Sequence, residues 1–217
     1  MQVVVIGATG LVGAMTVREM LDNGCTVDGI VRRPAGLRHP RWREHVASAA
    51  DWPRIARTIG AEAAVSALGT TTRKAGDEAG FRAVDHDMVL EFARAARDGG
   101  ARRMATVSSV GAVPGSSNFY LRLKGEMEQA VQAVGFDRLD IFRPGLLRGP
   151  RGADRRLGER LGILVSPLVN LALRGPLDRF AAIDAGAVAC AIAASLRCEE
   201  PGVFVHDNRA IRRLARR

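Results

Sequence analysis

The sequence has few cysteines, and their arrangement limits what they can do. Cys25, Cys190 and Cys198 are the only three, and no two of them form a C-x-x-C pair. An odd, scattered set argues against a disulfide framework or a zinc site and suits a reducing compartment. We therefore expect no metal site and no stabilisation by disulfides.

The sequence also lacks a hydrophobic run long enough to cross a bilayer. The longest apolar stretch, residues 161–173, is short and is interrupted by Pro167 and Asn170. The first residues, MQVVVIGATG, have neither the basic segment nor the apolar core of a signal peptide. We expect a cytoplasmic protein without a membrane span.

Lysine is nearly absent, so the formal net charge of +9 comes from arginine. Lys74 and Lys124 are the only lysines. A basic protein attracts nucleic acid or anionic lipid, and it equally attracts a phosphorylated cofactor. The arginines are scattered except in the C-terminal "RAIRRLARR", and no recognisable nucleic-acid module accompanies them. Nucleic acid is therefore not expected as a partner, and the tail could dock on the domain, bind an anion or be disordered.

Short apolar runs alternate with segments of helical spacing along the 217 residues. The runs that predict strands cover residues 2–6, 26–31, 46–49, 63–68, 103–108, 139–142 and 203–205. Helices are predicted over residues 11–21, 53–59, 81–97, 121–134, 157–173 and 184–196. Strands that are apolar on both faces indicate a parallel sheet covered by helices.

This pattern predicts an α/β fold, a Rossmann-like doubly wound parallel sheet in the order 3-2-1-4-5-6. A seventh strand is a further expectation. The length suits one domain over residues 1–217, in which residues 148–217 contribute a small C-terminal helical part on the substrate side. Ligands of such sheets bind at the carboxyl ends of the strands.

The first predicted strand ends in a glycine-rich loop, GATGLVG, over residues 7–13. Gly7 allows a tight turn, Gly10 lets the backbone approach a phosphate, and Gly13 lets the helix pack close to the strand. The helix that follows offers free N–H groups and the positive end of its dipole to a pyrophosphate. The loop predicts a dinucleotide site.

The second strand ends in Arg32-Arg33-Pro34. A site that prefers NAD usually has an acidic residue there, which accepts hydrogen bonds from the ribose hydroxyls. Asp28 lies inside the strand and is not in that place. Two guanidinium groups suit a 2′-phosphate, which they can bind bidentately, so NADP is expected in preference to NAD.

Two further strand ends carry candidate cofactor residues. Asp51 follows the third strand, where a carboxylate could accept a hydrogen bond from the adenine amino group. The fourth strand ends in Leu68-Gly69-Thr70. The small residues there would let a cofactor lie against the backbone.

The fifth strand ends in Ser108-Ser109, and Tyr120 and Lys124 open the next helix. A spacing of four residues puts the lysine and the tyrosine on one helix face. An ammonium group nearby favours the phenolate form, so this tyrosine could exchange a proton with a substrate oxygen during hydride transfer. A serine could hold the same oxygen, and the lysine could also reach the nicotinamide ribose. The alternative is an ordinary surface helix that carries both residues by chance.

Together these motifs resemble the short-chain dehydrogenase/reductase superfamily, and in particular its atypical or extended members. The stretches "LGTTTRKAGDEAGFRAVDHDMV", "SSNFYLRLKGEME" and "FDRLDIFRPGLL" are similar to the Tat-interacting-protein group and its bacterial relatives. The resemblance covers residues 2–147 well and the remainder loosely.

The resemblance implies roles for individual residues. The pyrophosphate would be held by Gly7, Thr9, Gly10, Leu11, Val12 and Gly13. The other cofactor residues that it implies are Arg32, Arg33, Leu68, Gly69, Thr70, Pro144, Gly145 and Leu146, the last three beside nicotinamide. Asp51, Ser108 and Lys124 are candidate cofactor residues from their positions in the sequence. The catalytic residues would be Ser109, Tyr120 and Lys124, with Ser108 as the alternative serine.

One departure from the superfamily pattern lies in the helix after the fourth strand. Many members carry an asparagine there, as part of a proton path, where this chain reads Val84-Asp85-His86-Asp87. The proton relay is therefore in question. We interpret His86 as a structural or surface residue.

The sequence therefore predicts an NADP-dependent oxidoreductase acting on a small carbonyl or alcohol. One alternative is an NADPH-binding regulatory or interaction protein with little turnover. Another is a nucleotide-sugar epimerase or dehydratase, although the short C-terminal part argues against a large sugar pocket. Flavin reduction is a further alternative, but such enzymes usually lack the Tyr-Lys pair. Helices that flank this type of sheet often pair, which leaves a homodimer open.

Overall fold

The computed structural model describes residues 1–70, 76–149 and 180–216. In this part of the chain a parallel sheet of seven strands has the order β3-β2-β1-β4-β5-β6-β9. The strands are β1 (Gln2–Ile6), β2 (Thr26–Val31), β3 (Trp42–Val46), β4 (Ala63–Ser66), β5 (Arg103–Val107), β6 (Arg138–Phe142) and β9 (Gly202–His206). The predicted Rossmann-like α/β fold is confirmed, including the seventh strand.

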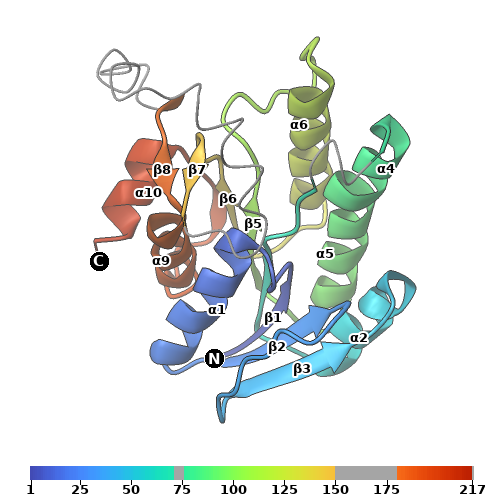
Figure 1. The fold of residues 1–217 in the computed structure, drawn as a ribbon, viewed down its shortest axis with the longest axis vertical. Helices are drawn as coiled ribbons and strands as arrows, with labels where there is room; N and C mark the ends of the chain where they lie inside the picture. Colours follow the sequence, from blue (N-terminus) through green and yellow to red (C-terminus); the bar gives the residue numbers. More distant parts are fainter. Residues whose placement is uncertain (71–75, 150–179, 217) are drawn as a thin grey trace.

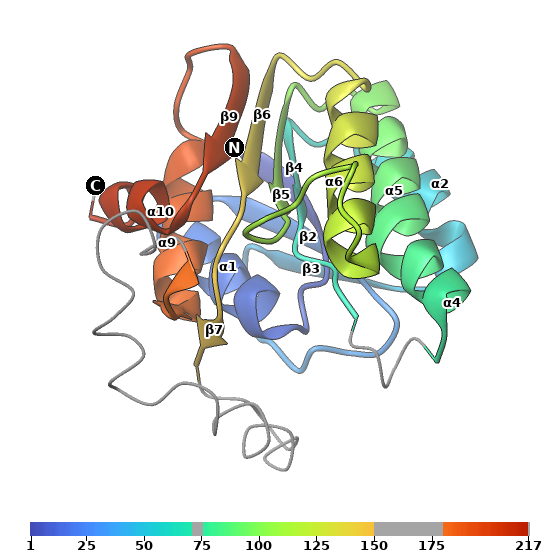
Figure 2. The ribbon, with the colours of Figure 1, turned by 90° about the horizontal axis from the view of Figure 1, so that it is seen from above.

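Helices cover both faces of the sheet (Figure 1). On one side lie α1 (Leu11–Asp22), α9 (Ala185–Ser195) and α10 (Asn208–Leu214). On the other side lie α2 (Trp52–Ile59), α4 (Glu78–Arg82), α5 (Met88–Asp98) and α6 (Phe119–Gln132). Figure 2, seen along a perpendicular direction, shows the same two layers on either side of the strands.

The central strands are buried on both faces, which explains why their sequences are continuously apolar. In β1, Val3 and Val5 pack with α1 and α9, whereas Val4 and Ile6 pack with α2 and α5. Successive side chains of a strand point to opposite faces, so a strand between two helix layers needs apolar residues at every position. Packing between the two helix layers holds the central strands in place, and with them the carboxyl ends where the candidate site lies.

The prediction for the third strand was wrong. Residues 46–49 were expected to form it, but β3 runs from Trp42 to Val46 and residues 49–51 form a 3₁₀ turn (η1). β3 is the edge of the sheet, and four of its five residues are polar or aromatic: WREHV. An edge strand need not be apolar on both faces, so a search for apolar runs passes over it.

The long helix predicted over residues 81–97 is divided into three parts. Ala83–Asp87 form a π-helical turn (η2) between α4 and α5. A π turn takes in an extra residue and so changes which side chains face inward. The apolar spacing of the sequence does not reveal this interruption, in which Asp85 is buried.

Helix α6 begins at Phe119, two residues before the predicted start at residue 121. The side chain of Asn118 caps it by accepting a hydrogen bond from the Leu121 N–H at 3.1 Å. Tyr120 therefore lies in the first turn of the helix. A second sheet, β7 (Leu147–Arg148) with β8 (Ile183–Asp184), was not predicted, because two-residue strands leave no readable pattern.

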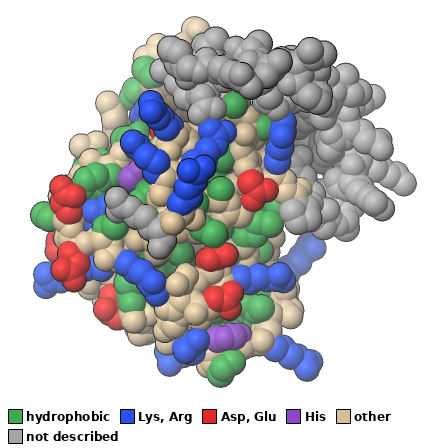
Figure 3. All heavy atoms as spheres, turned by 90° about the vertical axis from the view of Figure 1, so that its left-hand side faces the viewer, with side chains coloured by type: hydrophobic (Ala, Val, Ile, Leu, Met, Phe, Trp, Pro, Cys, Tyr) green, Lys and Arg blue, Asp and Glu red, His purple; other side chains and the backbone are tan. Residues whose placement is uncertain are grey.

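The arginine-rich tail forms α10 and docks on the domain. Asp207 caps the helix by accepting a hydrogen bond from the Ala210 N–H at 2.8 Å, and Ile211 is fully buried. Arg209 and Arg213 remain exposed. Figure 3 shows Lys and Arg side chains gathered on the side of the molecule where α10 lies in Figure 1. Leu214 and Ala215 also pack against the core, so the helix docks through its apolar face while these arginines stay in solvent.

Helix α9 follows the prediction for residues 184–196, and Asp184 caps it by accepting a hydrogen bond from the Gly186 N–H at 2.7 Å. The helix predicted over residues 157–173 lies outside the described residues. Of the helices in the described part of the chain, none combines the length and apolar character needed to cross a membrane.

Candidate functional site

The glycine-rich loop is packed so tightly that side chains are excluded at two positions. Gly7 has a φ of +79°, and a Cβ there would stand 2.5 Å from the carbonyl carbon of Ala67. A Cβ on Gly13 would overlap the carbonyl oxygen of Gly7. The loop therefore brings the start of α1 directly against the ends of β1 and β4, as the sequence predicts.

The first turn of α1 offers its backbone N–H groups to a ligand. Gly10 is the N-cap, and it provides no side chain that could occupy these groups. The N–H of Gly10 itself donates to the Gly7 carbonyl at 2.9 Å, which closes the turn. The N–H groups of Leu11, Val12 and Gly13 have no partner within the helix, so the positive end of the helix leaves them available to an anion.

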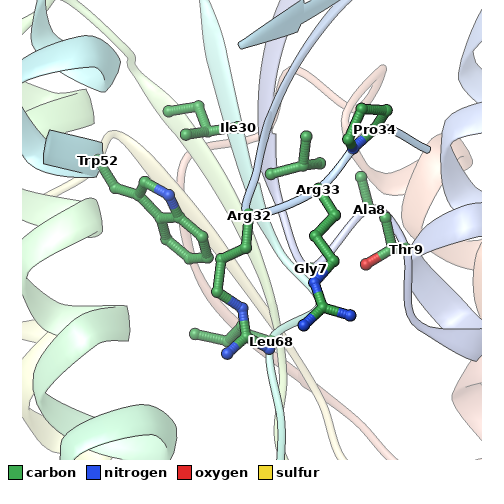
Figure 4. A pocket seen from close by; sticks show the side chains of 10 residues that line it. Gly7, Ala8, Thr9, Ile30, Arg32, Arg33, Pro34, Trp52 and Leu68 are labelled. Carbon is green, nitrogen blue, oxygen red and sulfur yellow. The ribbon is translucent and has the colours of Figure 1, made fainter. Parts of the chain in front are cut away.

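A cavity of about 580 Å³ opens beside this loop. Its size falls in the range of small-molecule and cofactor sites. It is lined by Gly7, Ala8, Thr9, Ile30, Val31, Arg32, Arg33, Pro34, Trp52 and Leu68. Figure 4 shows the side chains of Arg32 and Arg33 extending in the same direction along the cavity, with Trp52 on the opposite side from Pro34 and Thr9. The ends of β1, β2 and β4 thus meet in one hollow.

The arginines at the end of β2 are exposed and, among the described residues, form no ion pair. Asp28, the acidic residue in the same strand, is buried and already has partners. It accepts hydrogen bonds from the Gln2 amide at 2.8 Å and pairs with the His45 ring at 2.9 Å. Asp28 therefore cannot take the place of a ribose-binding acid.

Asp51 is not among the residues that line the cavity. Its carboxylate accepts a hydrogen bond from the Ser48 hydroxyl at 2.7 Å and lies 3.5 Å from the Arg54 guanidinium. The Ser48 hydrogen bond is the main cause that lowers the pKa of Asp51, assisted by Arg54. The neighbouring Trp52, which is 3% exposed, supplies the wall instead. The sequence interpretation missed Trp52, which lies at the start of α2 and is separated from the end of β3 by residues 47–51.

Lys124 is buried and holds an ion pair with Asp85. Its Nζ lies 2.7 Å from Oδ1 of Asp85, and the side chains are 3% and 1% exposed. The other oxygen of Asp85 accepts a hydrogen bond from the backbone N–H of Thr70 at 2.8 Å. The predicted residues of β4 and α6 are thereby joined through a residue from η2 that the sequence interpretation did not assign to the site.

Tyr120 lies one helical turn before Lys124 and is half-buried. Its ring packs edge-on against Phe81, with 5.7 Å between the ring centroids. Within the described part of the chain its hydroxyl makes no hydrogen bond. This hydroxyl is therefore available to a ligand.

The two serines at the end of β5 have different surroundings. The Ser108 hydroxyl is buried and donates to Glu128, which also accepts hydrogen bonds from the Arg143 guanidinium. The hydrogen bonds to Glu128 raise the pKa of Arg143 above its usual value. Among the described residues, the only contact of the Ser109 hydroxyl is to the Val110 carbonyl at 3.4 Å, at the limit of a hydrogen bond. Ser109 is therefore the serine that is free to bind another oxygen.

The loop after β6 is held from several sides. The Pro144 carbonyl accepts a hydrogen bond from the Val110 N–H at 3.1 Å, and the Leu146 carbonyl accepts one from the Ile183 N–H at 2.9 Å. The Gly145 N–H donates to the side chain of Asn208 at 2.9 Å. Asn208 is fully buried at the start of α10, and the sequence interpretation missed it. The docked tail thus supports a predicted cofactor loop.

The remaining polar candidate is His86, which pairs with the residue next to it. Nδ1 of His86 lies 2.7 Å from Oδ1 of the exposed Asp87, beside α5, in agreement with a structural or surface role. Across the described ranges no group of three His, Cys, Asp or Glu residues could hold a metal ion.

Comparison with known sequences identifies relatives of the chain. A model of a family described as NAD(P)H-binding matches residues 7–162. The chain is 37% identical over 170 residues to "Protein fmp52, mitochondrial" of Emericella nidulans, covering 70% of each chain. It is 36% identical over 165 residues to "Protein HTATIP2" of Rattus norvegicus, covering 73% of this chain and 67% of that protein. Because the fungal relative is named mitochondrial, the cytoplasmic location stays a prediction without support from the relatives.

Solved structures share the fold at low sequence identity. MoeE5 in complex with UDP-glucuronic acid and NAD matches with a TM-score of 0.73 and 17% identity, over 96% of this chain and 76% of that chain. The human epimerase family protein SDR39U1 with NADPH matches with a TM-score of 0.67 and 19% identity, over 95% of this chain and 74% of that chain. The predicted resemblance to the Tat-interacting-protein group is confirmed, and the chain belongs to the NAD(P)H-binding family of Rossmann-fold proteins.

Proposed function

We propose that the protein is an NADP-dependent oxidoreductase that acts on a small carbonyl or alcohol. The observation that carries the proposal is the Tyr120 hydroxyl, which has no partner among the described residues, one helical turn from the buried Lys124 ammonium. A free hydroxyl on the same helix face as a positive charge is suited to proton transfer to a carbonyl oxygen.

The adenosine half of the cofactor would lie in the cavity at the ends of β1 and β2. The N–H groups at the start of α1 would bind the pyrophosphate, and the indole of Trp52 offers a flat apolar surface for the adenine ring. Arg32 and Arg33 would bind the 2′-phosphate, which favours NADP over NAD. Asp51 lies next to Trp52, so a contact with the adenine amino group remains a proposal.

The nicotinamide half would lie toward the ends of β4, β5 and β6. Residues 68–70 and 144–146 would flank it, and the N–H groups of Lys124 that Asp85 does not use would bind the ribose hydroxyls. Ser108 is held by Glu128 and would shape this wall without contacting the substrate.

When bound, reduced nicotinamide would supply a hydride to the carbonyl carbon of the substrate. Tyr120 would donate its hydroxyl proton to the carbonyl oxygen as the negative charge develops there. Ser109 would donate a hydrogen bond to the same oxygen and so fix its direction. The products would be an alcohol, the oxidised cofactor and a Tyr120 phenolate that regains its proton from solvent. In the reverse direction Tyr120 would act as the base.

The test is NADPH oxidation with a panel of small aldehydes and ketones, compared between the wild type and Tyr120→Phe. We expect carbonyl-dependent turnover in the wild type and a loss of at least a hundredfold in the variant, with NADPH affinity within about threefold. If NADPH binds tightly and no carbonyl supports turnover, the oxidoreductase proposal fails and an NADPH-binding regulatory protein replaces it.

A second candidate, a nucleotide-sugar epimerase or dehydratase, is favoured by one observation. The structural neighbours include MoeE5, solved with UDP-glucuronic acid and NAD, although its 17% identity shows only the fold. This candidate requires a cofactor that stays bound through the catalytic cycle. Release of NADP⁺ into solution after each turnover, measured by its accumulation beyond one equivalent, would contradict it.

A further inference from the structure

Asp85 is a buried carboxylate whose orientation depends on a local irregularity in the chain. It lies in the π-helical turn η2, between α4 and α5, and is 1% exposed. Asp87, two residues later in the same turn, is exposed. Burying an ionised carboxylate is costly unless it is paired and hydrogen-bonded, so a residue in this position needs specific partners. π turns of this kind are frequent at functional sites.

The two oxygens of Asp85 bind two different elements. Oδ1 pairs with the Lys124 ammonium of α6 at 2.7 Å, and Oδ2 accepts from the Thr70 N–H after β4 at 2.8 Å. Gly69 lies against the same carboxylate, since a Cβ on it would stand 3.7 Å from Oδ1. One side chain therefore connects the turn after β4 with the helix that carries Tyr120.

The carboxylate also determines what Lys124 can do. A lysine ammonium has three N–H donors, and the bond to Asp85 uses one of them. Lys124 makes no other ion pair in the described ranges. Its long side chain has many rotamers, and a buried partner at 2.7 Å selects one of them. The directions of the two remaining N–H groups follow from this choice.

We propose that Asp85 is a positioning residue for the nicotinamide half of the cofactor: by tying Lys124 to the turn at residues 68–70, it fixes both walls between which nicotinamide and its ribose bind. The inference rests on the proposed cofactor site. It assigns no contact between Asp85 and the cofactor itself, and the adenosine half does not depend on it.

The experiment compares NADPH with 2′,5′-ADP, which carries the adenosine half and the 2′-phosphate but no nicotinamide. Asp85→Asn keeps the size and an acceptor for the Thr70 N–H but removes the charge that holds Lys124. We expect the variant to bind NADPH at least tenfold more weakly and 2′,5′-ADP within about twofold of the wild type. Asp87→Asn, an exposed change in the same turn, is the matched control, and both ligands should bind it as they bind the wild type.

The outcomes separate the possible explanations. Equal weakening of both ligands would show that Asp85 only supports the fold, and unchanged NADPH affinity would show that Lys124 needs no such anchor; either result overturns the inference but leaves the cofactor proposal standing. If the wild type binds neither ligand, the cofactor proposal fails first and the inference with it.

A second variant is used if Asp85→Asn does not fold. Asp85→Asn combined with Lys124→Met removes both charges of the buried pair, so no unpaired ion remains. This double variant should bind 2′,5′-ADP normally and NADPH at least tenfold more weakly. If the single variants fold, NADPH affinity is also compared between Lys124→Met and the double variant. Adding Asp85→Asn to Lys124→Met should weaken NADPH binding by less than twofold. A full tenfold effect in that background would contradict an action through Lys124.

Discussion

The two halves of the candidate site are built in different ways. At the ends of β1 and β2, the proposed adenosine side consists of backbone N–H groups, tightly packed glycines and two exposed arginines. At the ends of β4, β5 and β6, the proposed nicotinamide side depends on buried polar groups that hold one another, such as Asp85 with Lys124 and Ser108 with Glu128. The main groups of the first half are short contiguous motifs, whereas those of the second are pairs of residues far apart in the sequence.

The difference predicts different responses to mutation. Exposed charges contribute little to the free energy of folding but much to binding of a charged ligand. Buried charge pairs contribute to both, because removal of one partner leaves the other uncompensated. The following changes test this contrast, from the largest expected loss of stability to the smallest.

Glu128→Ala should cause the largest loss, because it leaves the Ser108 hydroxyl without its acceptor and Arg143 without its counter-charge. We expect the free energy of unfolding to fall by about 3–5 kcal/mol, measured by urea denaturation. Glu126→Ala, on the same helix and paired with the more exposed Arg82, should cost less than about 1 kcal/mol. Similar losses in the two variants would contradict the role given to burial.

Gly13→Ala should destabilise the adenosine side through packing alone. Its Cβ would overlap the Gly7 carbonyl oxygen, so α1 has to move away from β1. We expect a loss of about 1–3 kcal/mol and weaker NADPH binding, measured by thermal unfolding and by titration. Gly115→Ala has open space around its Cβ and serves as the control, with both quantities close to wild type. A Gly13→Ala protein that binds NADPH normally would show that the close approach is dispensable.

Arg32→Ala and Arg33→Ala should separate binding from stability. Each removes an exposed guanidinium, so the free energy of unfolding should change by less than about 0.5 kcal/mol. The affinity for 2′,5′-ADP should fall roughly tenfold in each variant, and the affinity for NADH should stay within about twofold. Equal losses for both ligands would mean that the arginines do not contact the 2′-phosphate.

The smallest effect concerns Asp51 at the exposed edge of the adenosine side. Its pKa is lowered in the folded protein, chiefly by the Ser48 hydroxyl, so its contribution to stability is present above the unfolded pKa and is lost as the pH falls through the folded pKa. Ser48→Ala should raise this pKa toward its ordinary value of 3.8, as measured by NMR titration of the carboxylate. An unchanged titration would show that the hydroxyl does not hold the carboxylate.

The same contrast explains how much the sequence predicts. The glycine loop, the arginines of β2 and the Tyr-Lys spacing are contiguous or one helical turn apart, so they can be recognised from the order of the residues alone. The partners of Lys124 and Ser108 cannot be recognised in this way, because a π turn and a contact between the end of β5 and helix α6 bring them together. The role of Asn208 cannot be predicted from the sequence either, since it lies at the start of α10 and accepts a hydrogen bond from Gly145, 63 residues earlier in the chain.

The edge strand β3 and the choice between Asp51 and Trp52 illustrate a second limit. Burial on both faces predicts the central strands, but an edge strand such as WREHV follows no such pattern. The sequence predicts the third strand over residues 46–49, and Asp51, the first carboxylate after it, is therefore the predicted cofactor residue. The wall of the cavity is instead formed by the indole of the next residue.

The central claim is that the chain binds NADPH through its glycine loop and the arginines of β2. A fluorescence titration of the wild-type protein with NADPH and, in parallel, with NADH tests it most directly. We predict micromolar binding of NADPH, with NADH at least tenfold weaker, which corresponds to about 1.4 kcal/mol. Equal affinity for the two cofactors would contradict the role of the arginines, and binding of neither would contradict the cofactor site as a whole.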